Sequence, residues 1–184
     1  STGRRRFGQK GSVELARKIM PKFLKFVDVV IGNEEDADNV LGIKAEDTEV
    51  HAGHISHDAY PTVAQQICKQ FDNVEFVAIT LRESLSANEN NWGAMLYEKA
   101  SDSACFSPLN EDEYSPFAIN NIVDRVGGGD SFAAGLIYAF CDDSSKDLQY
   151  KLDFAVAASC LTHSIKGDFN FSKKNEVIDL MKGN

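Results

Sequence analysis

Apolar residues recur along this chain at the spacing typical of helices. Five segments show an apolar residue at every third or fourth position, and each is predicted to be helical. These segments are residues 12–26, 58–71, 132–140, 146–165 and 173–181. Pro21 interrupts the first segment and is predicted to end that helix. A sixth, shorter helix with an acidic start is predicted at residues 34–41.

Short runs rich in β-branched residues separate these segments and predict strands. Residues 27–31 and 76–80 read as buried strands, residues 119–123 read as a third strand, and residues 93–98 and 103–107 read as a pair. Strands that alternate with helices predict an α/β fold with a mostly parallel central sheet. Ligands bind such sheets at the carboxyl ends of the strands.

Three polar or glycine-rich features each follow a predicted strand: Asn33, Thr80 and the glycines Gly127, Gly128 and Gly129. We therefore expect them to converge at one edge of the sheet. The glycines permit backbone conformations that side chains forbid, and the helix after them turns free N–H groups toward the loop. Such a place holds an anion, most often a phosphate.

Asp130 comes directly after the glycines, where its carboxylate would repel an anion unless it had a task of its own. That task is to take a proton from a hydroxyl group that attacks a phosphoryl group. The alternative from the residues alone is that Asp130 caps the helix and the glycines form only a tight turn. The stretch is not a Walker A loop, because no Gly-Lys-Ser/Thr follows it.

Composition narrows the classes of partner. The formal net charge of −9 argues against nucleic acid and against an anionic membrane surface. The four cysteines lie far apart, which is typical of a reduced, cytoplasmic protein. No signal peptide and no long apolar span are evident, so neither secretion nor membrane insertion is expected. His51, His54 and His57 read as a polar loop rather than a metal site.

Three motifs in order resemble those of the ribokinase-like, or phosphofructokinase-B-type, sugar kinases. Asp124-Arg-Val-Gly-Gly-Gly-Asp-Ser-Phe is similar to the signature Asp-Thr-x-Gly-Ala-Gly-Asp-x-Phe, and Val29-Val-Ile-Gly-Asn-Glu-Glu-Asp and Val77-Ala-Ile-Thr-Leu-Arg-Glu-Ser agree as well. Within that family, the residues of these motifs are most similar to those of the 2-keto-3-deoxygluconate kinases. The resemblance implies a three-layer α/β/α fold, of which residues 1–184 would form the C-terminal nucleotide-binding and catalytic part of one domain. The N-terminal part and the lid would be missing.

The resemblance also implies roles for particular residues. Asp130 would be the general base that contacts the sugar hydroxyl, and the N–H groups of the glycines would stabilise the transferring phosphoryl group of ATP. Asn33 and Asp36 match the family motif Asn-x-x-Glu, which organises Mg²⁺, water and phosphate. Asp124 would help to bind a monovalent cation such as K⁺, although Arg125 stands where the signature has threonine. The alternative is that Asp124 only forms a turn.

Three further residues fall in regions where the family binds its substrates. Thr80 and Arg82 would contact the nucleotide, with Arg82 either on a phosphate or paired with Glu83. Asp168 would contact the sugar substrate or merely form a turn. Trp92 is expected to pack rather than to carry adenine, and His163 is expected to be a polar residue on a helix face.

The resemblance thus implies ATP-dependent phosphorylation of 2-keto-3-deoxygluconate to 2-keto-3-deoxy-6-phosphogluconate. Two alternatives stay open: a fructokinase-type sugar kinase, and a nucleotide-binding module without activity. These 184 residues alone are expected to be inactive. We also expect a homo-oligomer or pairing with the missing N-terminal part, because a truncated sheet exposes an edge or an apolar face.

Overall fold

The computed structural model describes residues 6–33, 36–43, 59–86, 88–142 and 147–183. The chain forms two compact units, each described here by itself. The first comprises Ser1–Ile79 and Tyr97–Ser103, and the second comprises Thr80–Leu96 and Ala104–Asn184. The predicted loop with His51, His54 and His57 lies outside the described residues.

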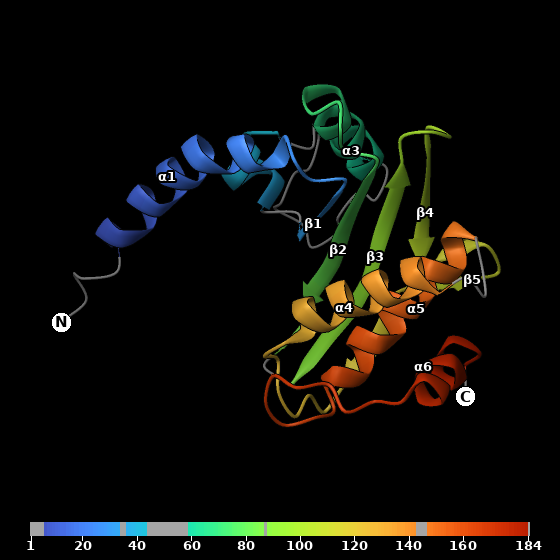
Figure 1. The fold of residues 1–184 in the computed structure, drawn as a ribbon. Helices are drawn as coiled ribbons and strands as arrows, with labels where there is room; N and C mark the ends of the chain where they lie inside the picture. The colour runs from blue at the N-terminus through green and yellow to red at the C-terminus, as the bar shows by residue number, and fades with distance from the viewer. Residues whose placement is uncertain (1–5, 34–35, 44–58, 87, 143–146, 184) are drawn as a thin grey trace. The chain divides into compact units, whose positions relative to one another are not determined.

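The described residues of the first unit form the helices α1 and α3, the helical turn η1 and the start of the sheet (Figure 1). Its elements are α1 (Arg6–Leu24), β1 (Val29–Asn33), the π-helical turn η1 (Ala37–Leu41), α3 (Ala59–Gln70) and the first half of β2 (Phe76–Ser84). Pro21 does not end its helix as predicted but lies inside α1. One turn follows it and buries Leu24, so proline removes a single backbone hydrogen bond without stopping the helix. Gly42, in the left-handed conformation with φ 71°, ends η1.

The described residues of the second unit form most of the remaining strands and the helices α4, α5 and α6. Its elements are the rest of β2, most of β3 (Glu89–Glu98) and of β4 (Ser103–Ser107), β5 (Leu109–Asn110), β6 (Glu113–Tyr114), β7 (Phe117–Asn120), α4 (Gly128–Cys141), α5 (Leu148–Thr162) and α6 (Lys174–Met181). The predicted strand at 119–123 is thus shorter and earlier, and a small antiparallel hairpin, β5–β6, precedes it.

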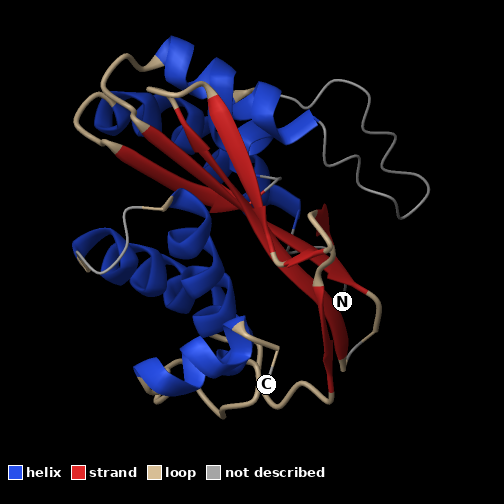
Figure 2. Ribbon diagram, turned by 90° about the vertical axis from the view of Figure 1, so that its right-hand side faces the viewer, coloured by secondary structure: helices blue, strands red, loops and turns tan. Residues whose placement is uncertain are grey.

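The sheet is of the α/β class as predicted but is mixed rather than mostly parallel. Its strand order is β1-β2-β3-β4, and β7 pairs with β3 in antiparallel register from Glu89↔Asn120 to Trp92↔Phe117. α3 lies between β1 and β2 in the chain, whereas only a few residues separate β2 from β3 and β3 from β4, and such short connections are typical of antiparallel strands. The long strands twist along their length, as Figure 2 shows in red.

The core of the second unit lies between α4 and α5. Gly135 of α4 brings the two helices close together, since a Cβ atom there would lie 3.0 Å from the Cα of Ala155. Phe132, Leu136, Leu152 and Val156 are fully buried around this contact. The packing fixes α4, and with it the glycine-rich turn at its start. Among the described residues, no helix is long and apolar enough to cross a membrane.

Candidate active site

The glycine-rich stretch forms the start of α4. Gly127 is the N-cap in the left-handed conformation, with φ 82°, and the N–H of Ser131 closes the first helical bond to its carbonyl at 2.8 Å. Gly128, Gly129 and Asp130 therefore make up the first turn, whose N–H groups have no acceptor within the helix. The predicted helix at 132–140 begins four residues earlier, at Gly128. The alternative that Asp130 is the N-cap is wrong: it is the third residue of the helix, and its side chain is exposed.

Each glycine of this turn meets a different environment. A Cβ atom at Gly127 would lie 2.6 Å from the carbonyl oxygen of Asp168, and one at Gly128 would lie 3.2 Å from Cε1 of His163. A Cβ atom at Gly129 would meet nothing within 4 Å. Two glycines are thus required by packing. The third leaves the face of the turn open, which is where a ligand could approach.

The Asp124 carboxylate fixes the loop that leads into the turn. Its Oδ1 accepts hydrogen bonds from the backbone N–H groups of Arg125 (2.7 Å) and Val126 (3.1 Å), and its Oδ2 accepts one from Gly167 (3.0 Å). These bonds hold the pKa of the Asp124 carboxyl below its usual range, and the bond from Gly167 has the largest effect. The carboxylate therefore has a structural role that needs no cation, and binding of K⁺ stays a prediction.

Two buried aromatic side chains, Trp92 and His163, pack against the glycine turn at Gly128. Trp92 donates from Nε1 to Ser159 Oγ at 2.7 Å, and Nδ1 of His163 lies 2.9 Å from the carbonyl oxygen of Ser159. The two rings are tilted against each other with their centroids 5.1 Å apart. Trp92 packs in the interior, as predicted. His163 is wrongly predicted as a residue of a helix face, because it lies just after α5 and is only 3% exposed.

Burial lowers the pKa of the His163 imidazole below its usual value, and the positive charges of Arg125 and Arg82 lower it further. The guanidinium groups of Arg125 and Arg82 therefore disfavour a positive charge on the His163 imidazole. Arg125 is held in place by a hydrogen bond from Nη2 to the carbonyl oxygen of Ser86, 2.6 Å long.

A buried polar network joins α4, α5 and the loop after α5. The Oγ of Ser131 lies 2.6 Å from Nδ2 of Asn170 and 2.7 Å from Oγ1 of Thr162. The carbonyl oxygen of Ala158 accepts from Nδ2 of Asn170 at 2.9 Å. This network is not predicted by the sequence, in which its only signal is the presence of hydroxyl side chains within apolar helical segments. It holds Ser131, the neighbour of Asp130, in place.

Thr80 and Arg82 lie on β2, in the same unit as the glycine turn. Thr80 lies inside the strand rather than after it, and its side chain is almost fully buried. Arg82 is exposed, while the carboxylate of its neighbour Glu83 accepts a hydrogen bond from Asn91 Nδ2 at 2.7 Å. Of the two, Arg82 is the better placed to meet a ligand. Nucleotide binding by either residue stays a prediction.

Asp168 enters the site through its backbone. Its carbonyl oxygen packs against Gly127, while its side chain is exposed. This geometry accounts for Asp168 as part of a turn, and contact with a sugar stays a prediction.

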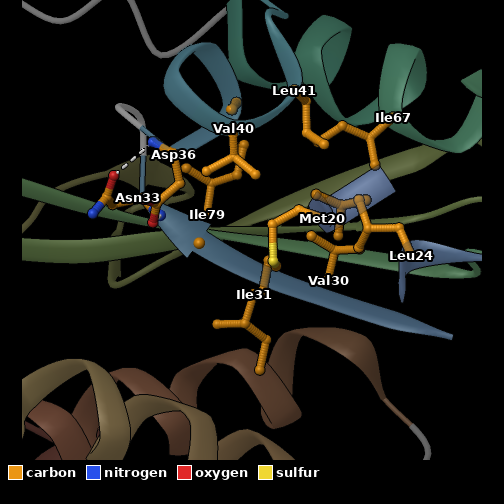
Figure 3. A pocket seen from close by; sticks show the side chains of 14 residues that line it. Met20, Leu24, Val30, Ile31, Asn33, Asp36, Val40, Leu41, Ile67 and Ile79 are labelled. Atoms are coloured by element: carbon orange, nitrogen blue, oxygen red, sulfur yellow. Dashed lines mark hydrogen bonds between the residues drawn. The ribbon is translucent and has the colours of Figure 1, made fainter. Parts of the chain in front are cut away.

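Asn33 and Asp36 bind each other in the first unit. The N–H of Asn33 donates to Oδ2 of Asp36 at 3.0 Å, and the N–H of Asp36 donates to Oδ1 of Asn33 at 2.9 Å, the bond dashed in Figure 3. This reciprocal pair stabilises the start of the helical turn in the manner of a capping box. Convergence of Asn33 and Asp36 with the glycine turn stays a prediction.

The pair lies at the edge of a cavity of about 250 Å³ that is lined mostly by apolar side chains of α1, β1, η1, α3 and β2 (Figure 3). Such a lining does not suit a phosphate group, so the two residues would act from its rim. Within the described ranges, no group of three or more His, Cys, Asp or Glu residues could hold a metal ion. Asp36 is exposed and could supply one oxygen, which fits Mg²⁺ because this ion usually takes one or two carboxylates together with phosphates and water.

Comparison with known proteins gives this geometry a context. The profile of the pfkB family of carbohydrate kinases matches residues 87–174, which include β3, the glycine turn, α4 and α5. A crystal structure of 2-dehydro-3-deoxygluconokinase from Thermotoga maritima is similar over 93% of this chain, with 41% identity and a TM-score of 0.79. The chain belongs to the pfkB carbohydrate kinase family.

Two further structures support the family and its ribokinase-like fold. A pfkB family carbohydrate kinase from Listeria grayi has 26% identity over 92% of this chain and a TM-score of 0.73. A protein from Enterococcus faecalis, provisionally named a 2-keto-3-deoxygluconate kinase, has 26% identity over 94% and a TM-score of 0.71. This pfkB chain spans only 46%, 46% and 45% of the Thermotoga, Listeria and Enterococcus proteins. No curated protein matches the sequence.

Proposed function

We propose that this chain supplies the phosphate-binding and catalytic part of an ATP-dependent sugar kinase whose substrate is 2-keto-3-deoxygluconate. The observation that carries the proposal is the 41% identity, over 93% of the chain, to the 2-dehydro-3-deoxygluconokinase of Thermotoga maritima. The glycine turn supports it, because its free N–H groups and open face suit a transferring phosphoryl group.

In this proposal the sugar hydroxyl attacks the γ-phosphoryl group of ATP in line. A bond forms from the hydroxyl oxygen to phosphorus, the bond from phosphorus to ADP breaks, and the Asp130 carboxylate takes the proton. Asp130 suits this role because it is exposed at the first turn of α4, beside the N–H groups of Gly128 and Gly129. Those groups stabilise negative charge on the phosphoryl oxygens. When bound, Mg²⁺ supplies positive charge to the phosphates, and Asp36 would hold it.

Because the chain spans 46% of the Thermotoga enzyme, we propose activity only for the complete fold. The 184 residues alone are proposed to bind MgATP weakly and to phosphorylate nothing. The test is ADP release from MgATP and 2-keto-3-deoxygluconate, by the chain alone and by the chain joined to the share of the fold that lies outside it in the Thermotoga relative. ADP release above the blank by the chain alone would refute the proposed inactivity of the 184 residues. Absence of ADP release by the joined protein would refute the proposed activity of the complete fold.

The role of Asp130 is tested by Asp130→Asn in the joined protein. We expect turnover to fall about 10²- to 10⁴-fold, the usual contribution of a general base, while MgATP still binds. Asp179→Asn is the matched control, because Asp179 is an exposed carboxylate on α6. Unchanged turnover in Asp130→Asn would remove the proposed base.

Fructose is the second candidate substrate, and comparing kcat/KM for the two sugars decides between them. A nucleotide-binding module without catalysis is the candidate of another class. It would bind MgATP in the joined protein and release no ADP with either sugar.

A further inference from the structure

The imidazole of His163 packs against the glycine turn at Gly128. It is 3% exposed, and its Nδ1 is held at 2.9 Å by the carbonyl oxygen of Ser159. The Trp92 ring is tilted against it, with the ring centroids 5.1 Å apart. The edge with Cε1 and Nε2 faces Gly128, and these atoms lie 3.2 Å and 3.6 Å from the position that a Cβ atom would take there. The ring is thus held from two sides with one edge toward the turn.

The hydrogen bond to Ser159 determines which nitrogen carries the proton. A carbonyl oxygen only accepts, so Nδ1 must donate, and the lone pair of the neutral ring is on Nε2. A second proton would therefore add at the edge that faces Gly128. No other titratable position of this ring is close to the turn.

The charges around His163 come from three elements. Arg125 in the loop before α4 and Arg82 on β2 both disfavour a positive imidazole, as burial does. Asp124 and Asp130 are the acidic residues on either side of the glycines, but three backbone N–H groups already bind Asp124, and the Asp130 side chain is exposed. Asp168 packs its backbone against Gly127, and its side chain is exposed as well. The ring is therefore neutral near pH 7 when no ligand is present. A bound anion would reverse the balance, because a nearby negative charge favours the charged form of histidine.

We propose that His163 is a proton-linked positioning residue of the glycine turn, in which an anion held at the first turn of α4 brings a proton onto Nε2. The proposal rests on the proposed function, since that function places an anionic phosphoryl group at this turn. It assigns to His163 a role in anion affinity rather than in the chemical step.

The sign of the pH dependence follows from linkage. If the bound anion raises the pKa of His163, anion affinity must rise as the pH falls from the pKa of the complex to that of the free protein, and must level off below both. An increase of one unit corresponds to about a tenfold gain in affinity across that range.

Sulfate is the appropriate probe, because it stays a dianion from pH 8 to pH 5 whereas phosphate and ATP titrate there. We expect the dissociation constant of sulfate, measured by calorimetry on the chain, to decrease about three- to tenfold between pH 8 and pH 5. His163→Asn, whose amide can still donate to Ser159, should show no such change. A variant in which His51, His54 and His57 are all replaced by glutamine is the control and should keep it.

NMR titration of the His163 ring gives a second measurement that does not depend on a variant. Saturating sulfate should raise the pKa of His163 in the wild-type chain. An equal pKa with and without sulfate would overturn the proposal, as would absence of sulfate binding at every pH or the same pH dependence in His163→Asn. The proposed function fails separately: if the joined protein releases no ADP while sulfate raises the pKa of His163, the kinase is refuted and the proton linkage stands.

Discussion

The three glycines before Asp130 differ in what the backbone and the neighbouring atoms require of them. Gly127 combines a left-handed φ of 82° with close contact to Asp168, whereas Gly129 is helical and has open space at its Cβ position. Alanine at these two positions therefore separates a conformational requirement from mere proximity to the site.

Gly127→Ala should destabilise the second unit by about 2 kcal/mol or more, through the left-handed conformation and the contact at 2.6 Å. Gly129→Ala should stabilise it by about 0.5 kcal/mol, because alanine favours the helix. Urea unfolding followed by the fluorescence of Trp92 measures both, since it is the only tryptophan and is buried in this unit. Equal effects of the two substitutions would contradict this account of the turn.

At the scale of elements, the Asp124 carboxylate ties the loop before α4 to the loop after α5. Because its pKa in the folded chain is below the unfolded value of about 3.9, it stabilises the fold above that value, and the stabilisation is lost as the pH falls through the folded pKa. Asp124→Asn should therefore lower the urea midpoint at pH 7, and its difference from wild type should shrink as the pH falls below about 4. Asp179→Asn controls for loss of an exposed carboxylate. A difference that stays constant down to pH 2 would show that the carboxylate charge does not matter.

Asn170 and Thr162 should depend on each other, because both meet the Oγ of Ser131. Asn170→Ala leaves Ser131 and the carbonyl of Ala158 short of a donor, and we expect a loss of about 1–3 kcal/mol. Thr162→Val should cost about 1 kcal/mol, and the double variant should depart from additivity by at least about 0.5 kcal/mol. Ser164→Ala is the control, because its exposed hydroxyl bonds only locally to Leu161. Additive losses would mean that the three side chains do not act as one network.

The sequence predicts helices and strands correctly where a regular pattern of apolar residues determines them. The apolar spacing correctly placed α3, α5 and α6, because their buried faces repeat with the helical period. It failed where tertiary contacts decide. Pro21 is tolerated inside α1, and β7 takes its direction from pairing with β3 rather than from its own residues.

The candidate site was predictable in its motif but not in its supports. Glycines followed by an aspartate indicate an anion site through backbone geometry alone. His163, Trp92 and Asn170 are brought to the turn by the folding of distant segments, and single residues in apolar stretches give no periodic signal of that.

For the whole molecule, exposed apolar side chains predict self-association of the 184-residue chain. Phe23 and Phe26, at the end of α1 and just after it, are 61% and 85% exposed. Because exposed aromatic side chains of this size mark association sites, we expect sedimentation velocity to show association that increases with concentration.

Replacing both residues with lysine tests the cause. The substitutions change the formal net charge from −9 to −7, which weakens electrostatic repulsion between copies, so a purely electrostatic effect would increase association. We expect a decrease, because the apolar contact is lost. Phe169→Lys with Phe171→Lys makes the same change in charge at side chains that are 66% and 69% exposed in the other unit, and should not decrease association. A wild-type chain that sediments as a monomer at all concentrations would contradict the prediction. An equal decrease of association in both double variants would show that the contact is not specific to the end of α1.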